Sequence, residues 1–152
     1  MIYHLYREQQ LRGDIETVWR FFSSPINLSK ITPENMRFTV LSKSDSEAIF
    51  EGMIIDYKVA PVLGILLRWQ TKITQVDQPR SFTDFQEKGP YKYWRHFHEF
   101  TPNQNGVLMK DRVDYELPFG IFGKIAHWAF VKRRLESIFN FRHDVLEKLF
   151  NR

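Results

Sequence analysis

The chain has 152 residues and no cysteine, which excludes disulfides, thiolate metal sites and cysteine nucleophiles. Its length suits one domain over residues 1–152, and its 43% hydrophobic and 26% charged residues are typical of a soluble globular domain. The longest apolar run contains Pro61 and Gly64, so no segment offers the roughly 20 apolar residues of a membrane-spanning helix. The N-terminus lacks the apolar core of a secretory signal, and we expect a cytoplasmic protein.

The net charge of +4 is concentrated in residues 122–152. This segment holds seven basic and three acidic residues, whereas the rest of the chain balances. Cations near the C-terminus of a helix are favoured by its dipole, and no nucleic-acid motif accompanies them here. We therefore expect no nucleic-acid partner, and leave open a weak contact of the basic C-terminal helix with an anionic membrane surface.

The beginning of the chain predicts one strand followed by two short helices. Residues 1–11 are strand-like. Asp14 then offers an N-cap to a helix whose apolar residues recur at helical spacing as far as Phe22. Residues 26–31 predict a second short helix, which ends before Pro33.

From Met36 onward the periodicity is that of β-strands. We predict strands over residues 37–41, 48–59, 67–76, 81–86, 93–100 and 107–117. Polar or Gly- and Pro-containing turns separate them, at residues 43–46, 61–64, 78–80, 87–91 and 101–106. Strands at this spacing indicate an antiparallel meander.

A helical pattern returns after Gly120. A helix over residues 123–150 would be roughly 42 Å long, enough to cross a small sheet. The order of strand, helices, six strands and long helix indicates an α+β fold, with helices packed on one face of the sheet. The apolar stripe that we expect this helix to bury consists of Ile125, Trp128, Ala129, Leu135, Ile138, Phe139, Val145, Leu146 and Leu149.

Three segments carry a resemblance to a known family. They are residues 82–100, 111–120 and 133–139, which read FTDFQEKGPYKYWRHFHEF, DRVDYELPFG and RRLESIF. Together they resemble a bacterial branch of the START/Bet v1-like superfamily, labelled SRPBCC or polyketide cyclase/dehydrase and lipid transport. The resemblance covers nearly the whole chain. It implies a helix-grip fold, in which a curved seven-stranded antiparallel sheet wraps around a long C-terminal helix and encloses an apolar cavity. Members differ in function, so the fold does not choose among activities.

Alternation along the last two predicted strands brings polar groups to one face of the sheet. His96 and His98 point to the same side, among aromatic residues, and Asp111 occupies that side of the final strand. If Phe100 pairs with Val107 around the predicted loop, His96 lies directly opposite Asp111. The sequence therefore predicts a polar patch on the concave face.

This patch supports three interpretations. It is a satisfied polar cluster in which Asp111 orients His96, a site that fixes the head group of a small amphiphile, or a general acid/base pair. Two histidines and a carboxylate also have the composition of a metal-binding triad. Without a fourth obvious ligand, we expect neither a metal nor a cofactor. We expect His127 and His143 at the surface.

We therefore expect a binding protein for a small hydrophobic or amphipathic molecule, held between the sheet and the C-terminal helix. The alternatives are a cyclase/dehydratase-type enzyme that uses His96 and Asp111, or a protein-interaction module. The identity of the ligand and the oligomeric state stay open, and the leading hypothesis assigns no catalytic residue. The candidate ligand-binding residues are Trp69, Phe85, Trp94, His96, His98, Asp111, Tyr115 and Trp128.

Overall fold

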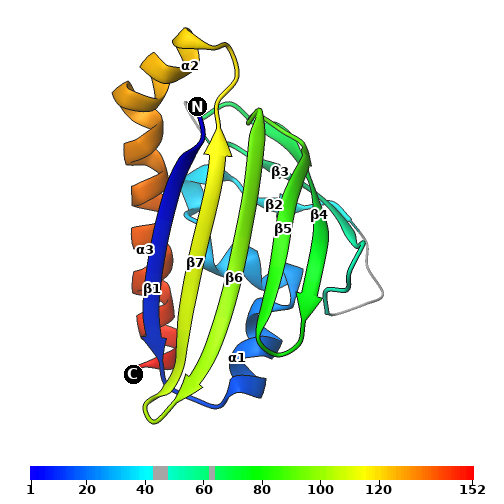
Figure 1. The fold of residues 1–152 in the computed structure, drawn as a ribbon, viewed down its shortest axis with the longest axis vertical. Helices are drawn as coiled ribbons and strands as arrows, with labels where there is room; N and C mark the ends of the chain where they lie inside the picture. The colour runs from blue at the N-terminus through cyan, green and yellow to red at the C-terminus, as the bar shows by residue number, and fades with distance from the viewer. Residues whose placement is uncertain (43–47, 62–63) are drawn as a thin grey trace.

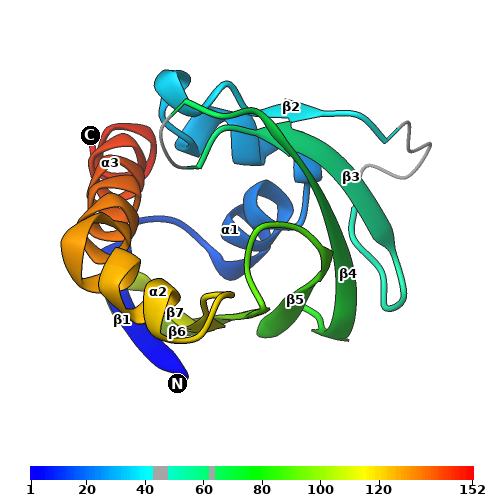
Figure 2. The same cartoon turned by 90° about the horizontal axis from the view of Figure 1, so that it is seen from above.

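Seven antiparallel strands form one sheet, in the order β1-β7-β6-β5-β4-β3-β2. The structure is a computed structural model and describes residues 1–42, 48–61 and 64–152. The sheet curves strongly (Figure 1, Figure 2). The predicted turn at residues 43–46, and part of the predicted break at residues 61–64, lie outside the described residues. The strands are β1 (Tyr3–Leu11), β2 (Thr39–Val40), β3 (Ile54–Val59), β4 (Leu67–Asp77), β5 (Ser81–Lys88), β6 (Tyr93–Asn103) and β7 (Gly106–Glu116).

The helices lie at the two ends of the chain, as predicted. Helix α1 (Ile15–Phe22) is capped by Asp14, whose Oδ1 accepts a hydrogen bond of 2.8 Å from the backbone N–H of Thr17. None of the described helices is long and apolar enough to cross a membrane. The other helical segments are the 3₁₀ turns η1 (Pro25–Ile31) and η2 (Glu34–Met36), helix α2 (Ile121–Ala126), the π-helical η3 (His127–Val131) and helix α3 (Lys132–Phe150).

Helix α3 is anchored along the edge strand β1, across the open side of the curved sheet (Figure 2). Gln9 of β1 donates through Nε2 to the backbone oxygen of His143 at 3.0 Å and to Oε1 of Glu147 at 2.9 Å. Asn151, just beyond the helix, donates through Nδ2 to the backbone oxygen of Gln10 at 3.0 Å. The arrangement is the α+β helix-grip fold that the resemblance implied.

The space between sheet and helices holds two large clusters of buried apolar residues. One surrounds Trp69 and Trp94 and includes Leu135 and Phe139 of α3. The other joins α1 to the opposite end of α3 and includes Phe100 and Leu146. Both halves of α3 therefore contribute to the core.

Two predicted strands are shorter in the structure. The strand predicted over residues 37–41 is reduced to β2, because Arg37 takes a left-handed conformation (φ 52°) at the end of η2. The strand predicted over residues 48–59 begins only at Ile54, because a turn precedes it in which Gly52 adopts φ 92°. Both strands are shorter than predicted because a residue near their start, Arg37 or Gly52, adopts a left-handed backbone conformation.

The β6–β7 hairpin is tighter than predicted. The strands continue through the expected loop and leave a turn of two residues, since Asn103 pairs with Gly106. Pro102 belongs to the predicted turn over residues 101–106, and the structure places it within β6. It is tolerated because β5 pairs with β6 only as far as Ser81, opposite Glu99, so the proline nitrogen points past the end of β5.

This tighter turn shifts the predicted pairing by two residues. His98, rather than His96, lies directly opposite Asp111, and His96 lies opposite Val113. The prediction of the direct partner was therefore wrong. A shift of two preserves the face of every side chain, so both histidines and the aspartate still share the concave side.

The predicted apolar stripe of the C-terminal helix is only half buried. Leu135 and Leu146 lie in the core, but Ile125 and Trp128 are exposed. The difference arises at η3, because a π-helical turn takes more residues than an α-helical one and rotates the preceding residues out of line with α3. Periodicity at α-helical spacing therefore misplaced the residues before Val131.

The two leucines at the end of α3 provide a direct test of this packing. Leu146 is 0% exposed and Leu149 is 51% exposed. We expect Leu146→Ala to lower the free energy of unfolding by about 2–5 kcal/mol, because it leaves a cavity in the core. Leu149→Ala should change it by less than about 0.5 kcal/mol. Urea unfolding of both variants measures the difference, and equal losses would contradict the orientation of α3.

Candidate functional site

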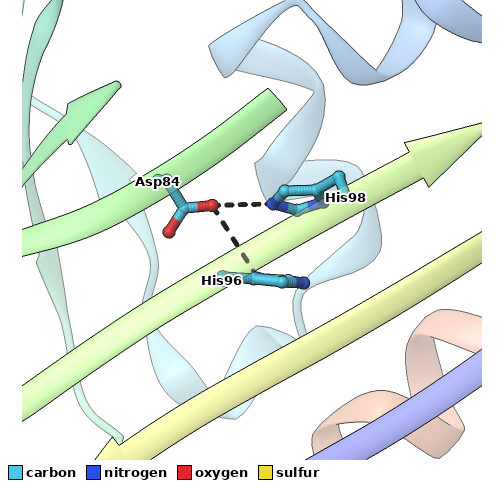
Figure 3. Close-up of side chains that lie close together, drawn as sticks. All are labelled: Asp84, His96 and His98. Carbon is cyan, nitrogen blue, oxygen red and sulfur yellow. Dashed lines mark hydrogen bonds and ion pairs between the residues drawn. The ribbon is translucent and has the colours of Figure 1, made fainter. Parts of the chain in front are cut away.

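Two histidines of β6 lie side by side between two aspartates of the neighbouring strands. The rings of His96 and His98 stack with their centroids 3.7 Å apart. Asp84 of β5 lies opposite His96, and Asp111 of β7 lies opposite His98. Figure 3 shows the Asp84 carboxylate directed toward both rings. The four side chains therefore form one polar cluster, which we call the His–Asp cluster.

The two histidines differ in how they meet the carboxylates. In His98, Nε2 is 2.7 Å from Oδ2 of Asp84, and Nδ1 is 3.3 Å from Oδ1 of Asp111. In His96, Nε2 is hydrogen-bonded to Oδ1 of Asp111 at 2.7 Å, while Nδ1 lies 3.8 Å from Asp84. Two carboxylates thus face both nitrogens of His98, which favours two N–H donors and a positive charge. His96 has one short contact with a carboxylate, so a single N–H donor, at Nε2, satisfies it.

These contacts act on the pKa values against the cost of burial. Burial opposes the charged form of all four groups. For His98, the hydrogen bonds to Asp111 and Asp84 outweigh burial and raise its pKa. For His96, burial and the neighbouring His98 prevail and lower its pKa. Despite their burial, the pKa values of Asp84 and Asp111 lie below the ordinary range, because both accept hydrogen bonds from the histidines.

A mainly apolar cavity of about 170 Å³ adjoins this cluster. Its walls come from the inner face of the sheet, from η1 and from α3. Asp84, His96 and His98 form part of the wall. The cavity is therefore apolar over most of its surface, with a few ionisable side chains in its wall. Aromatic and aliphatic residues of the other walls include Leu28, Ile31, Tyr57, Trp69, Tyr91, Trp94, Leu135, Ile138 and Phe139.

Half of the predicted site residues lie in the cavity wall. These are Trp69, Trp94, His96 and His98, and their contact with a ligand stays a prediction. Asp111 is 2% exposed and lies behind the histidines, outside the cavity wall. It is hydrogen-bonded to His96, as the first and third interpretations of the patch require.

The other three predicted residues lie elsewhere. Phe85 is on the outer face of the sheet against Tyr93, because alternation in β5 turns Asp84 inward. Tyr115 is buried, but its hydroxyl is hydrogen-bonded to Nε2 of His127 at 2.8 Å, away from the cavity. Trp128 is 86% exposed, a consequence of the π-helical turn. His127 was expected at the surface, and this contact holds it half-buried.

Sequence reasoning missed two acidic or basic residues of the cavity, Asp84 and Arg142. Asp is depleted in strands, so an aspartate at position 84, within the predicted strand over residues 81–86, could have been recognised as a candidate functional residue. Arg142 lies four residues from both Ile138 and Leu146, which places it on the buried face of α3. Its guanidinium lies over the ring of Phe139, with the carbon 4.8 Å from the ring centroid.

Asp84, His96 and His98 are also the one group of three potential metal ligands among the described residues, with ligand atoms within 4.8 Å of one another. Asp111 contacts the remaining nitrogen of each histidine, as a partner behind metal ligands does. However, the 2.7 Å contact between Asp84 and His98 is shorter than the roughly 3.3 Å that separates two ligands of a tetrahedral zinc ion. The side chains as they stand fit a hydrogen-bonded cluster better than a metal centre.

The buried and the half-buried aspartate of β7 test the charge balance of the cluster. Asp114 is hydrogen-bonded to His4 at 2.6 Å on the outer face, so it is a less buried aspartate of the same strand that also pairs with a histidine. Asp111→Asn should lower the free energy of unfolding at pH 7 by roughly 3–5 kcal/mol, since it leaves buried histidines without their carboxylate. Asp114→Asn should cost less than about 1 kcal/mol. Urea unfolding compares the two.

The same variants have a defined pH dependence. The pKa of Asp111 is lowered in the folded protein. Its contribution to the free energy of unfolding is therefore complete above about pH 4 and is lost as the pH falls further. The raised pKa of His98 gives the opposite pH dependence. Its contribution to the free energy of unfolding is present below about pH 6.5 and is lost as the pH rises through the pKa of the folded state. Asp111→Asn should also lower the His98 pKa, measured by NMR titration of the ring. An unchanged His98 titration would contradict the cluster.

Comparison with known proteins gives a family and a set of similar folds. The family model described as polyketide cyclase / dehydrase and lipid transport matches residues 13–140. No curated protein matches the chain. Among solved structures, protein CV1439 from Chromobacterium violaceum has a TM-score of 0.72 at 14% identity, with 99% of each chain covered.

Two further structures extend the similarity. Protein Ms6760 from Mycobacterium smegmatis has a TM-score of 0.66 at 17% identity, with 96% of this chain and 92% of that chain covered. The major latex-like protein 151 from Panax ginseng has a TM-score of 0.59 at 16% identity, with 90% and 96% covered. At these identities the structures support the fold alone. The family model covers most of the chain, and the protein therefore belongs to the polyketide cyclase / dehydrase and lipid transport family.

Proposed function

We propose that the protein binds a small amphipathic molecule in the cavity between the sheet and α3. The observation that carries this proposal is a mainly apolar cavity whose wall contains a few ionisable side chains. Ligand sites commonly combine apolar walls with a few polar groups that orient the ligand. The family and the fold are consistent with binding of hydrophobic ligands.

The cavity restricts the size and the orientation of such a ligand. Its volume of about 170 Å³ resembles that of apolar cavities known to admit a benzene-sized molecule. Trp69, Tyr91 and Trp94 offer ring faces and edges to a flat apolar body. The ionisable side chains of the cavity wall would meet the polar end. A ligand of one or two rings with a polar substituent fits this description.

A second candidate function is catalysis, and the hydrogen bond between His96 and Asp111 favours it. His96 lines the cavity, and its lowered pKa keeps the ring neutral, as a general base requires. A cyclase or dehydratase of this kind would lose turnover but keep ligand binding when His96 is replaced by Gln. Loss of both would leave binding as the function of the residue.

Two adjacent residues of β3 test the cavity as a binding site. Ile55 lines the cavity, and its neighbour Ile54 points outward, 42% exposed. The neutral, fluorescent two-ring probe 1-naphthylamine should bind the wild type and raise its melting temperature by mass action. Ile55→Trp fills the cavity and should weaken binding at least about tenfold, a loss equivalent to 1.4 kcal/mol. Ile54→Trp should bind normally.

The measurement is probe fluorescence, with circular dichroism to confirm that both variants are folded. Overpacking can cost about 1–3 kcal/mol, so some loss of stability in Ile55→Trp is expected. Equal probe affinity in the two folded variants would show that the probe binds elsewhere and would count against the proposed function.

A further inference from the structure

Two buried hydrogen-bond donors of the cavity wall lack acceptors. Among the side chains that the structure describes, the fully buried nitrogen and oxygen atoms without a hydrogen-bond partner are Nε1 of Trp69 and Nε of Arg142. Both residues line the central cavity, Trp69 from β4 and Arg142 from α3. Buried polar groups are nearly always paired in folded proteins, so two exceptions at one cavity require an explanation.

Arg142 is the more unusual of the two. Only 9% of its surface is exposed, and within the described part of the chain its guanidinium has an aromatic contact with Phe139 but no hydrogen bond and no ion pair. The positive charge of Arg142 helps to lower the pKa of Asp84, but the Asp84 carboxylate is hydrogen-bonded to His98 and not to the guanidinium. Asp111 is likewise occupied by the histidines. Arg142 is therefore a buried cation whose fork of donors is unused.

The guanidinium group selects a particular chemistry. It is planar and permanently charged, and its parallel N–H groups match the two oxygens of a carboxylate. A buried cation without a directly paired counter-ion is costly, and a carboxylate at this place would supply both the paired charge and the acceptors. An alcohol or a neutral amide would supply an acceptor but not the charge.

We propose that the ligand is an organic acid with a compact, ring-bearing apolar body, whose carboxylate pairs with Arg142. This inference rests on the proposed function and names the class of ligand. The aromatic residues around Trp69 would hold the body, and a hydrogen-bond acceptor on the body would satisfy Nε1 of Trp69. The His–Asp cluster then lies beside the ligand, rather than serving as its anchor.

Two isosteric probes test the assignment, 2-naphthoate and 2-naphthamide. They share the ring system and differ in charge. By isothermal titration calorimetry, the wild type should bind 2-naphthoate about 10- to 100-fold more tightly, as expected for a hydrogen bond to a charged group. Arg142→Met removes the guanidinium at similar length and should abolish this preference. Arg20→Met, which replaces an exposed arginine of α1, should retain it.

The outcomes separate this inference from the proposed function. Equal binding of both probes by the wild type would overturn the carboxylate assignment and leave the cavity as a binding site. A preference that survives in Arg142→Met would also overturn it. Failure of both probes to bind would count against the proposed function and this inference together. If Arg142→Met does not fold, the wild-type comparison and Arg142→Lys, which keeps the charge but loses the fork, still decide the question.

A second inference comes from the segment that joins β7 to α3. Phe119, Phe122 and Trp128 are 81%, 73% and 86% exposed, and Ile121, Ile125 and Phe130 are exposed beside them. We call these six residues the α2 patch. Large exposed apolar groups gathered on one segment mark an interaction surface. Helix α2 lies at the upper end of the molecule in Figure 1, where it stands clear of the strands.

The charges of this segment identify the kind of partner. Residues 117–133 contain no acidic residue. Lys124, Lys132 and Arg133 are all exposed beside the patch. Exposed aromatic residues with lysine and arginine on a short helix are typical of segments that lie in the interface of anionic membranes. We infer that the α2 patch docks on an anionic lipid surface.

Vesicle flotation tests this second inference. Wild-type protein should float with vesicles of phosphatidylcholine containing one third phosphatidylglycerol, and much less with phosphatidylcholine alone. The double variant Phe122→Ser/Trp128→Ser should lose most of this binding. Phe50→Ser, which alters an exposed phenylalanine outside the patch, should not. Absence of wild-type flotation at low salt would overturn the inference. A dimer in light scattering that the double variant converts to a monomer would also overturn it, in favour of a protein interface.

Discussion

Two carboxylates face the inner side of the sheet, Asp111 fully buried and Asp84 partly buried, and their charge is stable there only beside positive charge and hydrogen-bond donors. His98 supplies two donors and lies between Asp84 and Asp111. His96 completes the cluster through its bond to Asp111. These contacts require three neighbouring strands in one particular register. A shift of one residue in any of them would turn a charged side chain to the other face of the sheet.

The same strand geometry places the cluster at the wall of the cavity. Alternation along β6 puts Trp94 on the same side as the two histidines, and alternation along β4 brings Trp69 beside it, with the two rings 5.3 Å apart at the centroids. The sheet thus presents aromatic and ionisable groups next to each other. Helix α3 supplies the opposite wall and, through Arg142, a buried cation. One helix therefore closes the cavity and contributes to its chemistry.

The exposed α2 patch and the central cavity are close in the structure. An apolar depression beneath α2 is lined by Phe119 and Phe122 of the patch, and it shares Pro61 and Tyr91 with the cavity wall. The π-helical turn η3 explains why the patch is exposed, since it turns Trp128 outward while α3 keeps its apolar face inward. A surface contact at α2 would thus lie next to the cavity that we propose as the ligand site.

The sequence by itself determined the class of fold and the sidedness of the central residues. A strand period of two and a helix period of 3.6 are local properties, so the element order and the shared face of His96, His98 and Asp111 could be inferred without knowledge of the partners. The shared face also survived an error of two residues in the hairpin, because such a shift leaves alternation unchanged.

Tertiary structure alone decided which side chains meet. The partner of His98 is Asp84, which comes from a third strand, and its inward direction depends on the β5–β6 register. The exposure of Trp128 depends on a π-helical turn that has no periodic signal. The unpaired state of Arg142 depends on the absence of an acceptor within reach in space among the described residues. Such contacts join residues far apart in the chain, and local periodicity carries no information about distance between them.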